Sequence, residues 1–140
     1  MGKPRQLTME HSMMRFGGET ALVTGAVYGI GAAIARRLSE GARVIALDRQ
    51  VCPWAEVDSS VKQVIVDVSA PEVSRIVAQA LGDRALDYSI NNAGIGQSKA
   101  IAETTDEDWD RFLRINLAAP FQLIRDLLTA SIHAAGPSST

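Results

Sequence analysis

Residues 19–31 read ETALVTGAVYGIG, and this stretch decides the fold. Its first six residues centre on three successive apolar side chains and predict a buried β-strand over 19–24. The three glycines that follow predict a tight turn, because glycine adopts backbone conformations that other residues avoid. A helix should then run from about Ile30 to Glu40, since its apolar residues share one face and Gly41 suits the position just past a helix end.

Further apolar runs extend this alternation along the chain. They predict strands at 42–47, 64–66 and 86–90, and their nearly continuous apolar character suits parallel strands covered on both faces. Strands that alternate with helices predict right-handed βαβ units. The predicted fold class is therefore α/β, a doubly wound parallel sheet with helices above and below it in three layers.

Two more helices are expected between and after these strands. Ser69 suits the N-cap of a helix that ends near Leu81. The other helical region covers 106–134, with or without a break, and its cap is Thr104 or Thr105. Three acidic residues follow that cap, where negative charge suits the positive end of the helix dipole.

Length and composition indicate one domain. Of the 140 residues, 46% are hydrophobic and 21% are charged, as in ordinary globular proteins. We expect a flexible tail over 1–15, the domain over 16–136 and a terminal stub over 137–140.

Charge and cysteine content narrow the function classes. The net charge of −2 provides no basic excess for nucleic acid. No apolar run approaches the roughly 20 residues that cross a bilayer, and no His, Cys or Asp spacing suggests a metal site. Cys52 has no partner for an intramolecular disulfide, which favours a cytoplasmic location.

The glycine-rich turn also predicts a chemistry. At Gly25, Gly29 and Gly31 a pyrophosphate can approach the backbone closely, and the helix N-terminus offers unpaired N–H groups and positive partial charge. Tyr28 and Ile30 lie within the turn and join the expected contacts. The alternative is a purely structural turn, since glycine trios also occur by chance.

A carboxylate follows at a spacing that fits a dinucleotide. Asp48 stands 23 positions after Gly25, near the offset of about 20 residues at which an acid meets the adenosine ribose. Its carboxylate accepts hydrogen bonds from both ribose hydroxyls and repels a 2′-phosphate, which favours NAD over NADP. Arg49 keeps NADP open, because an arginine can pair with a 2′-phosphate, but a solvated charge is the preferred interpretation of Arg49.

Four motifs then stand in a fixed order. The glycines follow a Gly-x3-Gly-x-Gly spacing, and the other motifs are Asp67-Val68, Asn91-Asn92-Ala93-Gly94 and Asn116. Together they resemble the short-chain dehydrogenase/reductase family of the single-domain type, over about residues 16–136. The resemblance implies a Rossmann-type, NAD(P)-binding fold.

The resemblance also implies roles for single residues. Asp67 would bond the adenine amino group, and the Val68 N–H would reach a ring nitrogen. The alternative for Asp67 is an acid that only begins a helix.

The last two motifs carry roles nearer the reaction. Asn92, Ala93 and Gly94 would pass the backbone close to the cofactor ribose, while the Asn91 and Asn92 side chains brace the neighbouring turn. Their alternative role is purely structural. Asn116 would be the catalytic asparagine, which holds a water of the proton relay through a helix irregularity. Its alternative is a polar residue on a solvated helix face.

The family's reaction needs a tyrosine with a lysine four positions later, and neither Tyr28 nor Tyr88 has this spacing. The resemblance implies a serine, and a tyrosine that acts as general acid/base beside a lysine four positions later. Ala32 stands four positions after Tyr28, and Asn92 stands four after Tyr88. We therefore expect a sheet truncated after about four strands, in the order 3-2-1-4, that keeps the cofactor-binding part and is inactive alone.

The leading prediction is an NAD(H)-dependent oxidoreductase, represented by its cofactor-binding part. The resemblance implies a small alcohol or carbonyl compound as the substrate of the intact family. Assembly into a homo-oligomer is kept as an open alternative. One rival is a non-catalytic nucleotide-binding or interaction module that pairs with a full-length relative. Another is a nucleoside-binding methyltransferase, which has no use for the motif at 91–94.

Overall fold

The computed structural model describes residues 16–134, with side chains as far as Leu128, so the expected tail and stub lie outside the described residues. The sheet is parallel, with the strand order β3-β2-β1-β4. Its strands are β1 (Thr20–Thr24), β2 (Arg43–Asp48), β3 (Val61–Ile65) and β4 (Tyr88–Ile90). The chain moves outward from β1 to β3 and then returns to add β4 on the other side of β1. This order confirms the predicted doubly wound α/β fold.

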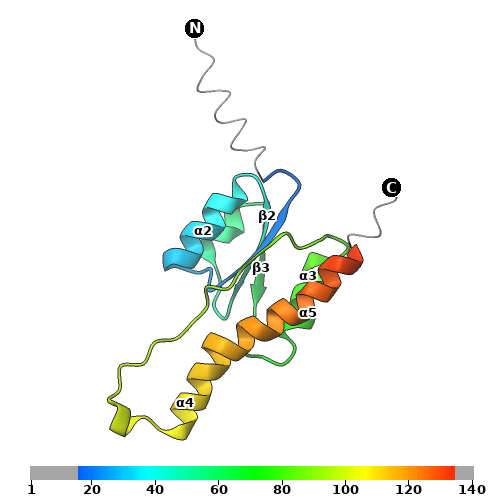
Figure 1. Ribbon diagram of the computed structural model, residues 1–140. Coiled ribbons are helices and arrows are strands. Elements are labelled where there is room, and N and C mark those ends of the chain that lie inside the picture. The colour runs from blue at the N-terminus through cyan, green and yellow to red at the C-terminus, as the bar shows by residue number, and fades with distance from the viewer. Residues whose placement is uncertain (1–15, 135–140) are drawn as a thin grey trace.

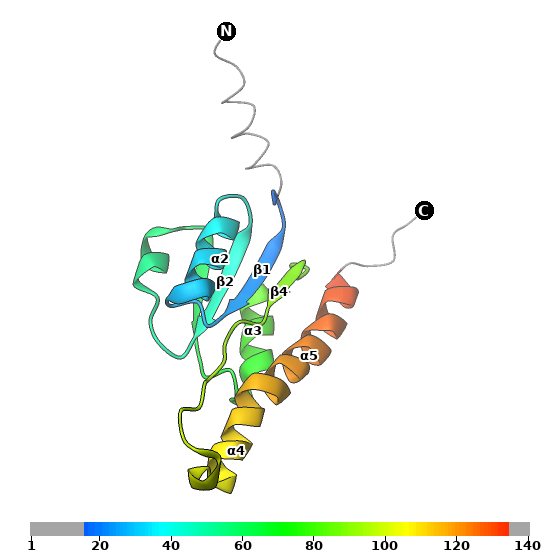
Figure 2. The ribbon, with the colours of Figure 1, turned by 60° about the vertical axis from the view of Figure 1, so that its left-hand side comes forward.

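Helices cover both faces of the sheet (Figures 1 and 2). α2 (Gly29–Ser39) lies on one face, and α3 (Val73–Leu81) and α5 (Ala119–Ala134) lie side by side on the other. α4 (Asp106–Leu113) precedes α5 and projects beyond the sheet. The predicted three layers are confirmed.

Alternate strand residues enter two apolar clusters, one on each face of the sheet. Leu22 and Ile45 pack in the cluster with α3 and α5, whereas Val23 and Val44 pack in the cluster with α2. All four are at most 1% exposed. Because successive side chains of a strand point to opposite faces, such continuous burial means that both faces of β1 and β2 are covered.

Two strand boundaries were predicted wrongly. β3 starts at Val61 rather than at residue 64, because pairing with β2 recruits Lys62 and Gln63 into the sheet. β4 is limited to 88–90, where it pairs with β1. Apolar content marks where a strand is buried, but the partner strand decides where it begins.

The predicted N-cap at Ser69 was also wrong. α3 begins at Val73, with Glu72 at the N-cap position. Ser69 instead donates its N–H and its hydroxyl to Asp67 Oδ1, at 2.8 and 2.6 Å. The side chain therefore stabilises a turn ahead of the helix, a competing use of short polar side chains near helix ends.

The helical region over 106–134 is broken. Thr105, not Thr104, caps α4: its Oγ1 accepts the Asp108 N–H, and the Asp108 carboxylate accepts the Thr105 N–H, both at 3.1 Å. A π-helical segment, Arg114–Ala118, then separates α4 from α5. Such a segment is wider than an α-helical turn and is frequent at functional sites.

Candidate functional site

Close contacts require glycine at two positions, one in the turn after β1 and one in the first turn of α2. Gly25 has a φ of +68°, and a Cβ there would lie 3.0 Å from the Ala93 Cα. A Cβ at Gly31 would lie 2.1 Å from the carbonyl oxygen of Gly25. The start of α2 therefore packs directly against the turn, and the first-turn amides of α2 have no intrahelical acceptor.

β2 fixes the turn by accepting hydrogen bonds from the backbone amides of the turn. The first two turn amides donate to the Leu47 carbonyl at 2.9 and 3.4 Å. Val27 N donates to Asp48 Oδ2 at 3.2 Å, and Gln50 N donates to Asp48 Oδ1 at 3.0 Å. The half-buried Asp48 carboxylate is thus oriented by the backbone, and each oxygen retains capacity for a further donor.

The chain that leaves β4 is tied to the same turn. Thr24 is buried, and its Oγ1 accepts the N–H groups of Asn92 and Ala93, both at 3.0 Å. Asn92 Nδ2 donates to the Gly25 carbonyl at 3.2 Å, as expected. Asn91 does not brace the turn, because its Nδ2 donates to the serine hydroxyl two positions earlier, at 3.4 Å.

These elements surround a cavity of about 380 Å³ at the carboxyl ends of the strands. The predicted cofactor-binding residues line it except for Gly31: positions 25 and 28–30 of the turn, Asp48 and Arg49, Asp67 and Val68, and 92–94. Sequence reasoning missed four apolar lining residues: Leu47, Val66, Ile95 and Ile115. Their spacing is that of ordinary core positions, so no sequence signal separates them from the core.

Asn116 lies outside the cavity lining and fixes the loop that follows β4. Its Oδ1 accepts the Ile95 N–H at 2.9 Å, and its Nδ2 donates to the Ile95 carbonyl at 2.8 Å. The predicted helix irregularity is present, since Asn116 sits within the π-helical segment. A Cβ at Gly94 would lie 2.8 Å from Asn116 Oδ1, so this glycine leaves room for the amide. The alternative of a solvated helix face is excluded.

Asp67 is both a turn-forming acid and a cavity residue. The Ser69 hydroxyl, followed by the Ser69 N–H, lowers the pKa of Asp67 below its usual value. Partial burial opposes this effect, while the charges of Arg49 and Arg111 lower the pKa further. The carboxylate is therefore ionised at neutral pH and presents an acceptor to the cavity.

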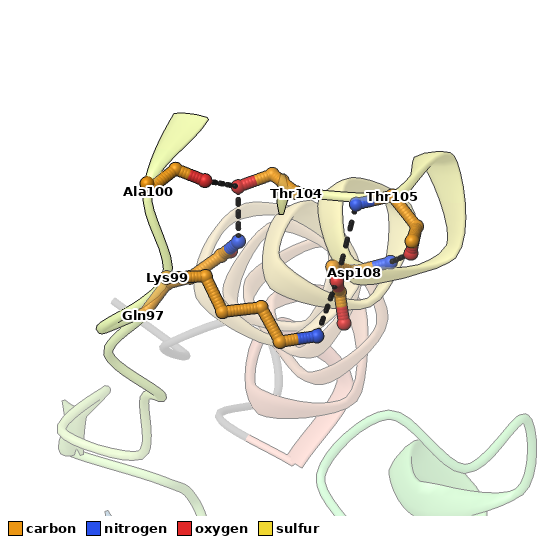
Figure 3. A network of polar contacts seen from close by, with 6 residues as sticks. All are labelled: Gln97, Lys99, Ala100, Thr104, Thr105 and Asp108. Atoms are coloured by element: carbon orange, nitrogen blue, oxygen red, sulfur yellow. Dashed lines mark hydrogen bonds and ion pairs between the residues drawn. The ribbon is translucent and has the colours of Figure 1, made fainter. Parts of the chain in front are cut away.

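A polar network holds the loop from β4 to α4 (Figure 3). Lys99 Nζ lies 2.7 Å from Asp108 Oδ2, on the same carboxyl group that caps α4. The Thr104 hydroxyl accepts from Gln97 Nε2 at 2.8 Å and donates to the Ala100 carbonyl at 3.1 Å. The bond from Lys99 is the main cause that lowers the pKa of Asp108. Exposed pairs of this kind contribute little stability, but here they set the path of the loop.

Neither a cluster of metal-binding side chains nor a helix suited to a bilayer occurs among the described residues. Among the side chains of residues 16–128, no group of His, Cys, Asp and Glu could hold a metal ion. Within residues 16–134, each helix is too short or too polar to cross a bilayer. Cys52 is buried, and burial raises the pKa of its thiol, so the reactive thiolate is disfavoured.

Comparison with known proteins gives a consistent result. The family model described as short chain dehydrogenase matches residues 19–137. A protein of Sinorhizobium fredii, described as an uncharacterized short-chain type dehydrogenase/reductase, is 37% identical over 125 residues, which cover 88% of this chain and 49% of that protein. The chain thus spans about half the length of the curated relatives it matches.

Solved structures share the fold. L-sorbose reductase from Gluconobacter frateurii, complexed with NADPH and L-sorbose, is similar with a TM-score of 0.76 at 31% identity, covering 83% of this chain and 48% of that one. A 4-hydroxyisoleucine dehydrogenase complexed with NADH is similar with a TM-score of 0.74 at 27% identity, covering 83% and 50%.

Proposed function

This chain belongs to the short-chain dehydrogenase family, and from that premise we propose that its cavity binds NAD(H) for hydride transfer between an alcohol and a carbonyl compound. One observation carries the proposal: the glycine turn, two carboxylates and the segment after β4 are far apart in sequence but line a single cavity. Each supplies what one part of a dinucleotide needs.

The pyrophosphate is assigned to the turn and the start of α2. First-turn amides of a helix offer donors and positive partial charge to an anion. The side chains of Tyr28 and Ile30 are 74% and 72% exposed, so they project into solvent beside the turn. The glycines keep the backbone accessible to the phosphate oxygens.

The adenosine is assigned to the carboxylate side of the cavity. Asp48 accepts from the ribose hydroxyls, because its carboxylate is already oriented at the end of β2. Asp67 accepts from the adenine amino group, with the Val68 N–H on a ring nitrogen. Ile115 offers an apolar surface to the base.

The choice of NAD over NADP rests on Asp48. The solved relatives do not decide it, since one is complexed with NADPH and another with NADH. A 2′-phosphate at the ribose would meet the Asp48 charge, and that repulsion is stronger in a partly buried site than in water. Arg49 is exposed and can remain solvated, so we assign the preference to NAD(H).

The chemical step is assigned only in part. Asn116 is proposed as a residue that positions the loop around the reacting ring, through its two bonds to Ile95. Neither Tyr28 nor Tyr88 is followed by a lysine four positions later. The 140-residue chain is therefore proposed to bind the cofactor without turnover. A cytoplasmic location is proposed with it.

A second candidate is a nucleotide-binding module that pairs with another chain, either a full-length relative or a second copy. It is favoured by the exposed apolar residues on the last helical region: Leu117, Phe121, Ile124 and Leu128. Co-purification with a full-length relative, together with absent turnover, would favour this candidate.

Calorimetric titration of the 140-residue chain tests the leading proposal. NADH should bind in a 1:1 ratio and more tightly than NADPH, and ADP should compete for the same site. Cofactor binding would be contradicted if NADH produced no heat of binding and did not displace ADP. Tighter binding of NADPH would contradict the role of Asp48 alone.

A further inference from the structure

Trp54 makes a contact with the glycine turn that its place in the sequence does not predict. It lies in the 3-10 helix η1 (Pro53–Val57), in the connection between β2 and β3, and η1 contributes no residue to the cavity lining. Its indole N–H donates to the Ala26 carbonyl at 3.0 Å. Ala26 is fully buried within the turn. The bond therefore joins a segment outside the cavity to the turn that shapes it.

Neighbouring elements hold the indole in place. The Arg36 guanidinium of α2 lies 5.4 Å from the centroid of the Trp54 ring, within the range of a cation–π contact. Cys52 N donates to Gln63 Oε1 at 2.8 Å, which ties the start of η1 to β3. Trp54 also packs, partly buried, against the apolar cluster on the α2 side of the sheet. The direction of its N–H is thus fixed by α2, β3 and the core.

Three different segments hold polar groups of the turn. β2 accepts the amides, Asn92 donates to the Gly25 carbonyl, and Trp54 donates to the Ala26 carbonyl. A buried carbonyl that loses its donor keeps the desolvation cost and gains nothing in return. Rotation of the peptide after Ala26 relieves that cost, and it also redirects the amides that follow toward α2.

We propose that Trp54 is a positioning residue for the phosphate-binding turn. Its indole N–H bonds the carbonyl of the peptide between Ala26 and Val27, while Asp48 Oδ2 accepts the N–H of the same peptide, and the two bonds together set the direction of the amides that lead to the start of α2. The role rests on the proposed dinucleotide binding and involves no contact with the cofactor.

The variant Trp54→Phe separates this role from general packing. It keeps an aromatic ring beside Arg36 but removes the N–H. Binding of NADH and of ADP should weaken about threefold to tenfold, the effect of one buried hydrogen bond. Adenosine has no phosphate, so its affinity, measured by NMR titration, should not change. An unchanged NADH affinity overturns the proposal, and so does an equal loss for adenosine and NADH.

Trp109→Phe is the matched control. Trp109 lies on α4, is 54% exposed and is remote from the turn in sequence and in element. Its replacement should leave the affinities for NADH, ADP and adenosine unchanged. A loss of NADH affinity in this control as well would mean that the Trp54 result reflects any tryptophan substitution, and would overturn the proposal.

If Trp54→Phe does not fold, a measurement on the unsubstituted chain still tests the proposal. The Trp54 indole N–H should exchange with solvent at least about tenfold more slowly than that of the exposed Trp109, because its bond must open first. Equal exchange rates overturn the positioning role. A protected Trp54 in a chain that does not bind NADH overturns the proposed function, and the positioning role with it.

Discussion

The two sides of β1 differ in how well the described residues bond and cover them. On the β2 side, Leu47, Asp48 and Trp54 form hydrogen bonds to the turn after β1, and β1 and β2 are buried on both faces. On the other side, β4 pairs with β1 over three residues, and the nearby helical region exposes an apolar stripe. The difference teaches that the proposed nucleotide site is built within the chain, whereas the stripe has the character of a surface that associates with something else.

Gly31→Val should have the largest effect, because it disrupts the packing of the glycine turn against α2. The Cβ alone would lie 2.1 Å from the Gly25 carbonyl oxygen, so the turn and α2 must move apart. We expect complete loss of NADH binding by calorimetry and a loss of about 3 kcal/mol or more in unfolding free energy. Gly96→Ala is the control, because a Cβ there meets nothing within 4 Å. NADH binding by Gly31→Val at wild-type affinity would refute the packing argument.

A pair of leucines on α5 tests the contrast directly. Leu123 is fully buried, whereas Leu128 is 58% exposed. Leu123→Ala should lower the unfolding free energy by about 2–5 kcal/mol, since it removes buried methyl groups and leaves a cavity. Leu128→Ala should change it by less than about 0.5 kcal/mol. Urea denaturation measures both. Equal losses would show that the exposed stripe is covered in solution, and sedimentation would then identify self-association.

The sequence predicted the parts of the site that need special backbone chemistry or charge. Gly25 and Asp48 stand out because a turn needs glycine and because an acid at the end of a buried strand is unusual. The order of strands and helices was predictable for a similar reason, as apolar runs separated by breakers leave few topologies open.

Other parts depended on contacts that no local pattern encodes. Ile115 and Leu47 look like core residues and also line the cavity. Trp54 reaches Ala26 across 28 positions, and nothing near it marks that bond. The cap at Ser69 was predicted wrongly, because the Asp67 carboxylate competes for the same hydroxyl.

Asp48→Asn tests the β2 side of the site, because it removes the charge of the side chain and nearly keeps its shape. The amide oxygen can still accept from Val27 N, so the turn should persist, while the amide NH2 takes the place of the oxygen that accepted from Gln50 N. The ratio of NADH affinity to NADPH affinity should fall about tenfold, the effect of removing one charged interaction. Asp83→Asn, on an exposed residue past the end of α3, is the control and should leave the ratio unchanged. A ratio that Asp48→Asn does not alter would assign the preference to another residue.

Ser69→Ala should give the smallest effect, seen only in acid. The folded chain holds the pKa of Asp67 below its usual value, with the Ser69 hydroxyl as the main cause. Asp67 therefore contributes stability that is fully present above the ordinary pKa of 3.8 and is lost as the pH falls through the lower folded value. Removal of the hydroxyl should raise the folded pKa toward 3.8 and shrink that acid-dependent loss, while Ser59→Ala, on an exposed serine, should do neither. Carboxyl ¹³C titration by NMR measures the shift. If Asp67 titrated at the same pH in the chain and in Ser69→Ala, the carboxylate would owe its low pKa to the backbone N–H of residue 69, which alanine keeps, and to the charges of Arg49 and Arg111.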